Sequence, residues 1–350
     1  MKEIIRVLIV DDSAYVRKVV REMLSYSPHL EVVGAARDGR EALELVEKLN
    51  PDVVTSDLIM PELDGIGFVR EQMRRRAIPI VMMSSQDENS AETLAALDAG
   101  AVDFVQKPTA LATEKIFEVR SELIEKVKTA ARSQMKNLQA LPDSKPTPEA
   151  VKISHEPYRD RFDVIAIGIS TGGPQALRYL IPQLPADFPV PIAIVLHMPV
   201  GYTSAYAEKL NEISALEVRE AREGDELRAG TVLLAPAGKH MTLRRRGAGG
   251  KVSAHLSLRP LDTQHRPAVD VLFQSAADTF GSRVLAVVMT GMGADGRNGA
   301  AWIKAHRGTV FAESEETCVV YGMPGAIVEA GLSDKIIRLD KMGQALMEVA

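Results

Sequence analysis

A serine stands in a turn of the kind that exposes a nucleophile. Residues 168–174 read GISTGGP and directly follow the largely apolar run 162–167, so Ser170 falls between a predicted strand and a predicted helix. Glycines permit the positive φ angles of a tight turn, and Pro174 suits the first turn of a helix. Free backbone N–H groups at such a helix start can stabilise an oxyanion. The segment therefore predicts a hydrolytic serine.

A serine hydroxyl is a weak nucleophile, so Ser170 needs a base and a group that orients the base. His197 directly follows the predicted strand 191–196, and Asp295 lies in the loop after the predicted strand 284–289. The carboxyl ends of parallel strands meet at one edge of a sheet, so we expect the three side chains there together. Their order along the chain is Ser, His, Asp, which differs from the Ser, Asp, His order of α/β-hydrolases. We therefore predict a triad on a different α/β fold.

The loop that carries Asp295 also fits another chemistry. Residues 291–296 contain three glycines in the spacing GxGxxG, after a predicted strand and before a predicted helix, and Glu313 follows the next strand. This is the arrangement of a dinucleotide-binding fingerprint, so a nicotinamide-dinucleotide enzyme is an alternative. That alternative gives Ser170 and His197 no task, whereas the triad uses all three strand ends.

A second set of polar residues ends the predicted strands of the first hundred residues. Asp11 and Asp12 end the first strand, Asp57 the third and Ser84 the fourth, and Lys107 follows the fifth. Carboxylate oxygens suit Mg²⁺, so we predict that the three aspartates hold this ion while the lysine balances charge. In such surroundings one carboxylate can attack a phosphoryl group, and Asp57 is best placed to do so. Helix capping is the alternative explanation for any one of these acidic residues.

Composition limits the class of protein. The 350 residues suffice for two domains, and 46% hydrophobic with 25% charged residues is typical of a globular chain. The net charge of −5 argues against a nucleic-acid surface. No apolar stretch approaches the roughly 20 residues of a membrane span and no signal peptide is recognisable, so we expect a cytoplasmic protein without membrane insertion. Cys318 is the only cysteine, which excludes an intrachain disulfide.

Short apolar runs alternate with helical patterns in both halves of the chain, which predicts two doubly wound α/β domains. We place the first at residues 1–125 and the second at 161–350. Residues 126–160 continue a helical pattern to about residue 140 and then mix prolines with charges, which predicts a linker. Runs at 241–243 and 252–258, joined by a glycine-rich turn, predict a β-hairpin inserted into the second domain. The predicted strands are 4–10, 30–35, 52–56, 78–83 and 102–105, then 162–167, 192–196, 231–234, 284–289 and 309–311.

The first half of the chain resembles the response-regulator receiver domain. The motifs that carry the resemblance are VDDS at 10–13, SDLIMP at 56–61, MSS at 83–85 and KP at 107–108. The resemblance implies a flavodoxin-like domain with a five-stranded parallel sheet. It implies that Asp57 accepts a phosphoryl group from a histidine kinase in the presence of Mg²⁺, and that Ser84, Phe104 and Lys107 take part in the switch.

The second half resembles the CheB family of chemotaxis protein-glutamate methylesterases and protein-glutamine glutaminases. The matching motifs are GISTGG at 168–173, HMP at 197–199, APAGKHM at 235–241, HRPAVD at 265–270, TGMGADG at 290–296 and YGMP at 321–324. The resemblance implies a Rossmann-like esterase domain that needs no cofactor. It implies a phosphorylation-activated hydrolase that demethylates glutamate methyl esters, with release of methanol, and deamidates glutamines. The implied substrates are the cytoplasmic parts of methyl-accepting chemoreceptors, in the adaptation of chemotaxis-type signalling.

Further residues are expected around the serine. The backbone N–H of Thr171 and one near Met292 are expected to receive the oxyanion, while His240, His265 and Tyr321 are possible contacts to the substrate. The resemblance also implies that the unphosphorylated receiver covers the active-site face. The remaining alternative is a phosphoswitched binding module without catalysis, in which the serine turn holds an anion at a helix N-terminus.

Overall fold

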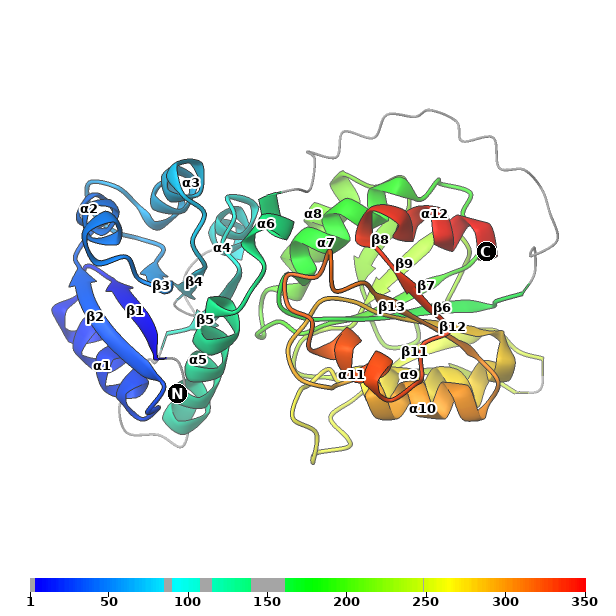
Figure 1. Ribbon diagram of the computed structural model, residues 1–350. Coiled ribbons are helices and arrows are strands. Elements are labelled where there is room, and N and C mark those ends of the chain that lie inside the picture. Colours follow the sequence, from blue (N-terminus) through cyan, green and yellow to red (C-terminus); the bar gives the residue numbers. More distant parts are fainter. Residues whose placement is uncertain (1–3, 85–89, 108–114, 140–160, 248) are drawn as a thin grey trace. The chain divides into compact units, whose positions relative to one another are not determined.

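The computed structural model of this protein describes residues 4–84, 90–107, 115–139, 161–247 and 249–350. The chain forms two compact units, residues 1–140 and 141–350 (Figure 1). Most of the predicted linker, residues 140–160, lies outside the described residues, as do Ser85 and Pro108 of the receiver-like motifs. Within the described ranges, no helix is both long enough and apolar enough to cross a membrane.

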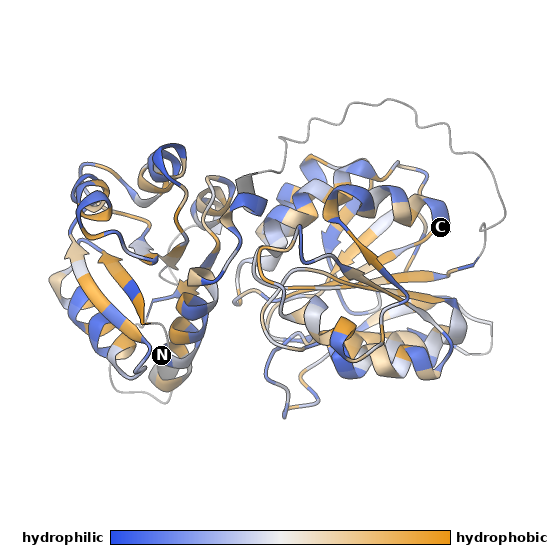
Figure 2. Ribbon diagram, viewed as in Figure 1, coloured by the Kyte–Doolittle hydropathy of each residue, from blue (hydrophilic) through white to orange (hydrophobic). Residues whose placement is uncertain are grey.

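The first unit contains one five-stranded parallel sheet in the order β2-β1-β3-β4-β5. Most residues of β1 and β4 are apolar and buried, as expected where helices cover both faces of a parallel sheet (Figure 2). The strands are β1 (Ile5–Val10), β2 (Leu30–Ala36), β3 (Val53–Asp57), β4 (Ile80–Ser84) and β5 (Asp103–Gln106). The helices are α1 (Ala14–Ser25), α2 (Gly39–Leu49), α3 (Gly65–Arg75), α4 (Ser90–Asp98), α5 (Lys115–Ala131) and α6 (Met135–Gln139).

Three helices of this unit begin at side chains that cap them. Ser13 Oγ accepts the N–H of Val16 at 3.3 Å at the start of α1. Asp38 and Asp64 cap α2 and α3 in the same way. Such caps satisfy backbone donors that a helix leaves unpaired, so they fix where each helix leaves the sheet edge.

The predicted continuous helix up to about residue 140 is wrong. Helix α5 ends at Ala131, and the short α6 begins only at Met135. The N–H groups of Arg132 and Ser133 bond to carbonyls three residues back, at 3.1 and 2.9 Å, which tightens and closes the last turn.

The second unit contains a seven-stranded parallel sheet in the order β14-β13-β12-β6-β7-β9-β8. Helices α7, α8 and α12 cover one face, and α9, α10 and α11 cover the other (Figure 1). The strands are β6 (Val164–Ile169), β7 (Ile192–Leu196), β8 (Glu217–Glu220), β9 (Thr231–Leu234), β12 (Val284–Val288), β13 (Thr309–Glu313) and β14 (Lys335–Ile337). The helices are α7 (Gly173–Leu180), α8 (Thr203–Glu212), α9 (Val269–Phe280), α10 (Arg297–Ala305), α11 (Met323–Glu329) and α12 (Leu339–Val349).

The two edge strands of this sheet, β8 and β14, were not predicted. They are four and three residues long and carry charged residues, of which Glu217 and Lys335 are exposed. Such short, partly polar segments lack an apolar run, which is how natural sheets often protect their edges.

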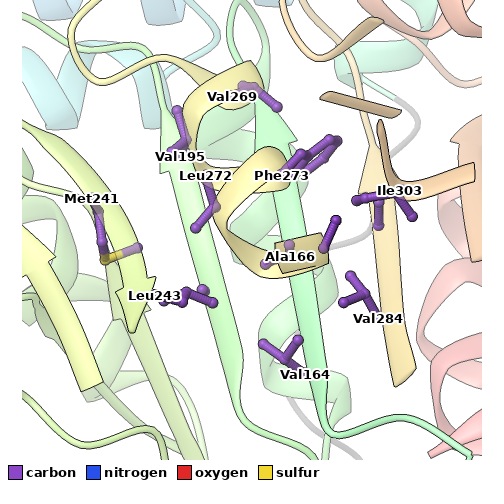
Figure 3. Packing of buried hydrophobic residues seen from close by; sticks show 14 of the residues in the cluster. Val164, Ala166, Val195, Met241, Leu243, Val269, Leu272, Phe273, Val284 and Ile303 are labelled. Carbon is purple, nitrogen blue, oxygen red and sulfur yellow. The ribbon is translucent and has the colours of Figure 1, made fainter. Parts of the chain in front are cut away.

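The predicted hairpin is present as β10 (His240–Arg245) and β11 (Val252–Ser257), which pair antiparallel. Its apolar side joins helix α9 in the core of the unit. Figure 3 shows Leu272 and Phe273 of α9 packed over β6, with Leu243 of the hairpin on one side and Ile303 of α10 on the other. Because Phe273 is fully buried, its truncation to Ala is expected to cost about 3–5 kcal/mol. This core holds the starts of α9 and α10 against the carboxyl end of β6.

Candidate functional site

The acidic residues of the first unit converge where the sheet order reverses, between β1 and β3. Asp11, Asp12 and Asp57 bring carboxylate oxygens within 4.8 Å of one another. Lys107 Nζ lies 2.6 Å from Asp57 Oδ1 and 3.1 Å from Asp11 Oδ2. Asp57 Oδ1 also accepts the N–H of Leu58 at 2.7 Å, which fixes the carboxylate at the end of its strand. The predicted cluster of charged groups is therefore assembled by the fold.

Burial shifts the pKa values of charged groups in this cluster. It raises the pKa of Asp11 above its ordinary value, even though Lys107 and the N–H of Ser13 act in the opposite direction. Burial would lower the pKa of Lys107, but its hydrogen bond to Asp57 and the two nearby carboxylates outweigh this effect and raise it. Three close carboxylates with one lysine leave negative charge uncompensated. The residues present therefore fit a small, hard divalent cation that prefers oxygen ligands.

Ser84 and Phe104 lie on the neighbouring strands of the same sheet. Ser84 ends β4, and its hydroxyl lies 3.0 Å from Thr93 Oγ1 of α4. Lys107 N–H donates to the Ser84 carbonyl at 2.7 Å, which ties the lysine to the same strand end. Phe104 is buried, with 2% exposure, and its carbonyl accepts Lys126 Nζ at 2.7 Å. The Ser84 hydroxyl and the Phe104 carbonyl thus contact helices α4 and α5.

In the second unit, Ser170 follows β6 directly and precedes α7. Its N–H donates to the Thr290 carbonyl at 3.0 Å, and its carbonyl accepts the N–H of Gly173 at 2.7 Å. Gly172, the residue before α7, has φ +77°, a conformation that favours glycine. A Cβ at Gly291 would lie 2.7 Å from Ser170 Cβ, so glycine is needed there for the two loops to approach. The turn thus holds the serine at the sheet edge.

His197 and Asp295 come to the same edge from the strands on either side of β6. Ile169 pairs with Leu196 in the sheet, so His197 is next to Ser170 in register, and its N–H donates to the Ile169 carbonyl at 3.2 Å. His197 Nε2 lies 2.9 Å from Asp295 Oδ2. Nδ1 is therefore the nitrogen left for the serine. It is buried and bonds to no group in the described part of the chain, so the serine–histidine bond is not formed in this conformation.

Asp295 is held by the start of helix α9 as well as by the histidine. Its oxygens accept the N–H groups of Val269 at 2.8 Å and Asp270 at 3.0 Å. Burial alone would raise the pKa of Asp295, but the His197 hydrogen bond, the imidazole charge and these two N–H groups together lower it. The carboxylate is therefore ionised at neutral pH, so the imidazole N–H at Nε2 is the donor in the shared bond.

Asp270 returns this contact by capping helix α10, a role that the sequence did not reveal. Its Oδ1 accepts the N–H groups of Gly296 at 3.0 Å and Gly299 at 2.7 Å. Asp270 and Asp295 thus cap each other's helices. The motif HRPAVD contained the residue, but its function is seen only in the pairing of two helix starts by aspartates that are 25 positions apart.

The other histidines near the site have different surroundings. The His265 ring stacks on the His197 ring, with centroids 4.1 Å apart and planes inclined by 24°. His265 therefore contacts the predicted base itself. The expectation that His240 contacts substrate is not supported, because its side chain is fully buried. Its nitrogens bond the Pro260 carbonyl at 3.1 Å and the N–H of Ala268 at 3.2 Å, so it instead joins two backbone segments.

The residues predicted to surround the oxyanion lie beside the serine turn. Thr171 follows Ser170, and its carbonyl accepts Thr290 Oγ1 at 2.9 Å. Met292 is half-buried and follows Gly291, which packs against Ser170. Tyr321 is half-buried and forms a β-bridge with Gly291. These residues therefore border the serine on the side of the β12–α10 loop.

The structure contradicts the two features on which the dinucleotide hypothesis rests, the free start of helix α10 and an accessible Glu313. The start of α10, where a pyrophosphate would have to bind, is capped by the Asp270 carboxylate. Glu313, the acidic residue expected to bind a ribose, has 0% exposure and accepts the N–H of Thr290 at 2.9 Å. Both groups are used inside the protein. The glycine pattern therefore serves a tight loop rather than a nucleotide.

Comparisons with known proteins agree with this arrangement. The family model described as CheB methylesterase matches residues 165–346, and the model described as response regulator receiver domain matches residues 7–118. A protein-glutamate methylesterase/protein-glutamine glutaminase of Myxococcus xanthus (strain DK1622) is 51% identical over 97% of this chain and 96% of its own length. One of Methanosarcina acetivorans is 42% identical over 99% of both chains. The crystal structure of the Thermotoga maritima CheB methylesterase catalytic domain aligns with a TM-score of 0.52 and 42% identity, covering 54% of this chain and 99% of that one.

Proposed function

The chain belongs to the CheB methylesterase family, with a receiver domain before the catalytic domain, and from that premise we propose which residues act and on what. We propose that the protein hydrolyses glutamate methyl esters, and deamidates glutamines, on the cytoplasmic part of methyl-accepting chemoreceptors. The observation that carries this proposal is the His197–Asp295 bond of 2.9 Å beside the Ser170 turn. It supplies a base and its orienting carboxylate next to a nucleophile.

The proposed reaction uses the three side chains in turn. His197 Nδ1 takes the proton of Ser170 Oγ as the oxygen attacks the ester carbonyl. The imidazolium returns the proton to the leaving methanol, and a water molecule then hydrolyses the acyl-enzyme by the same steps. Asp295 keeps the proton on Nε2 and stabilises the imidazolium, for which its lowered pKa suits it. This arrangement exchanges the roles that the two ring nitrogens have in chymotrypsin-like triads.

The oxyanion that forms on the substrate needs donors that are already in place. We assign this role to the N–H of Thr171 and to an N–H near Met292, on the two loops that meet at Ser170. Losing one such donor in comparable enzymes costs about 2.7–4 kcal/mol. His265, stacked on the base, limits the orientations open to the imidazole.

In the receiver we assign Asp57 as the phosphoacceptor, with a histidine kinase as the phosphodonor. Asp11, Asp12 and Asp57 would hold Mg²⁺, which supplies positive charge to the phosphoryl oxygens when bound. Lys107 already contacts two of these carboxylates and supplies further positive charge. Ser84 and Phe104 would transmit the change to the surrounding helices.

We propose that phosphorylation raises the activity of the catalytic domain by relieving inhibition by the receiver. The phosphoryl group acts only through the difference in free energy between the inhibited and active arrangements. A chain that lacks residues 1–150 is therefore expected to release methanol faster than the unphosphorylated full chain. A folded fragment with an equal or lower rate would contradict inhibition by the receiver.

One experiment tests both halves of this function. Methanol release from methylated receptor membranes is measured for the wild type, Ser170→Ala and Asp57→Asn, each with and without a small phosphodonor and Mg²⁺. Ser170→Ala is expected to be inactive, and Asp57→Asn to keep its basal rate without stimulation. A full rate for Ser170→Ala would overturn the esterase assignment, and no release by any variant would favour a binding module.

A further inference from the structure

Glu313 is a completely buried carboxyl group that the proposed chemistry does not use. It ends β13, next to the strand that leads into the Asp295 loop, and its side chain has 0% exposure. Oε2 accepts the N–H of Thr290 at 2.9 Å, and Oε1 accepts the hydroxyl of Thr317 at 3.0 Å. A buried carboxyl group without a cationic partner is costly. A structural or functional role should therefore explain why this carboxyl group is buried beside the active-site loop.

The reason lies in the residue that it holds. The Thr290 carbonyl accepts the N–H of Ser170 at 3.0 Å, and its hydroxyl donates to the Thr171 carbonyl at 2.9 Å. The same hydroxyl accepts the N–H of Val320 at 3.0 Å. Thr290 thus joins the serine turn, the predicted oxyanion segment and the loop before Tyr321. Glu313 holds this junction in place through the hydrogen bond that it accepts from the Thr290 N–H.

We propose that Glu313 is a positioning residue for the esterase reaction, acting through Thr290 to hold the Ser170 turn against the loop of Met292 and Asp295. The inference rests on the function proposed above. Because its side chain is completely buried, Glu313 would act on the serine turn through its bond to Thr290 and not by contact with the substrate. Its effect should therefore fall on kcat rather than on KM.

The surroundings of Glu313 let its charge change near neutral pH. Burial raises its pKa to about 7, against the Thr290, Thr317 and Cys318 donors that lower it. Cys318 is the titratable neighbour that acts on the carboxyl group within the described residues, and burial raises the pKa of its thiol, which stays neutral. Glu315 and Lys335, on the adjoining segments, are exposed.

Both charge states can satisfy their hydrogen bonds, so protonation changes the strength of the contact without unfolding the loop. When Glu313 is protonated on Oε1, the Thr317 hydroxyl can accept that proton in a hydrogen bond and donate to the Ser314 carbonyl, 3.3 Å away. Oε2 still accepts the Thr290 N–H in this state. The ionised form binds that N–H through a stronger, charge-assisted hydrogen bond. The hydrogen bond to the Thr290 N–H is therefore strongest above the pKa of Glu313, although burial of the charge lowers the stability of the folded state there.

The test compares kcat and KM for methanol release by full-length wild type, Glu313→Gln and Glu313→Leu between about pH 5.5 and pH 8.5. Leu removes the acceptor and leaves the Thr290 N–H buried and unpaired, so we expect a kcat about tenfold lower at unchanged KM. Gln keeps a neutral acceptor but cannot ionise. The ratio of wild-type to Gln kcat should therefore rise about threefold as the pH passes through 7.

The outcomes separate this inference from the function on which it rests. Ser170→Ala is measured in parallel, and if it keeps the wild-type rate, the proposed function fails. If Ser170→Ala is inactive while the Gln variant follows the wild type at constant ratio at every pH, only the positioning role fails. Should the Leu variant not fold, as judged by circular dichroism, the pH dependence of the Gln ratio still decides.

Discussion

The two sites of this protein occupy equivalent places in two parallel sheets. They differ in the groups that compensate the negative charge of the carboxylates. The receiver site lies between β1 and β3, and the esterase site lies where β6 is flanked by β7 and β12. In both sheets the order of the strands reverses at this point, which opens a crevice at their carboxyl ends. The topology explains the location of each site. It does not explain their chemistry.

The chemistry depends on what compensates the carboxylate. In the receiver, Asp57 faces Lys107 at 2.6 Å and two further aspartates, so added negative charge has large effects there. In the esterase, Asp295 is neutralised by helix N–H groups and by one imidazole. The first arrangement suits a carboxylate that reacts and is switched by charge. The second suits one that stays ionised and orients a base.

The largest expected effect tests whether Asp295 acts through the histidine. Asp295→Asn is expected to lower kcat by about 10⁴-fold, because an amide can no longer keep the proton on the correct nitrogen of His197. The matched control is Asp270→Asn, whose amide oxygen can still accept the two N–H groups that Asp270 Oδ1 accepts. We expect less than about a tenfold loss for the control. Equal losses in methanol release would mean that Asp295 serves only as a helix cap.

The second prediction concerns Glu313, a buried carboxyl group that is bound by neutral donors and, within the described residues, by no cationic side chain. The pKa of Glu313 is raised from 4.5 to about 7 on folding. Between these two values the folded state holds a proton that the unfolded state has lost, so stability falls as the pH rises. The fall amounts to about 3 kcal/mol and levels off above the folded pKa.

Glu313→Gln removes this dependence. The difference in Tm between the variant and the wild type should therefore increase in favour of Gln as the pH is raised from about 5 to about 8. Thermal unfolding followed by circular dichroism at several pH values provides the measurement. A difference that does not change with pH would show that Glu313 does not titrate in this range.

The smallest expected effect is the stabilisation of the receiver by Mg²⁺, which tests whether the three aspartates form a cation site. At a Mg²⁺ concentration about ten times its Kd, binding is expected to stabilise the receiver by about 1.4 kcal/mol. Asp11→Asn, which removes one buried charge, should weaken this effect, while Asp295→Asn should leave it intact. Thermal unfolding with Mg²⁺ and with a chelator measures it. Equal stabilisation of the Asp11 variant would contradict a site built from the three aspartates.

Most of the fold could be predicted because the central strands contain runs of apolar residues. The central strands and the hairpin were confirmed on this basis. The family, which was predicted from motifs, was confirmed by the comparisons. The edge strands β8 and β14 escaped prediction because short segments with charged residues resemble loops. The break between α5 and α6 escaped it because nothing in the apolar spacing marks the closing turn.

The site residues also divide into those whose positions could be predicted from the sequence and those whose role could not. Asp57, Ser170 and His197 follow apolar strands directly, so their positions at a sheet edge could be inferred from the chain alone. His240 begins a strand, β10, and its burial and its bonds to Pro260 and Ala268 give it a structural role. A residue type and its place along the chain do not show which way a side chain turns.

The sequence by itself determined the two α/β domains and the residues that end the central strands, because runs of apolar residues mark the buried strands. Its motifs determined the family. Only the tertiary structure decided that Asp295 bonds Nε2 of His197 and shares helix caps with Asp270. It also decided that Glu313 supports Thr290 rather than a nucleotide. These contacts join residues 23 to 98 positions apart, and their geometry depends on how helices and loops pack across the sheet edge.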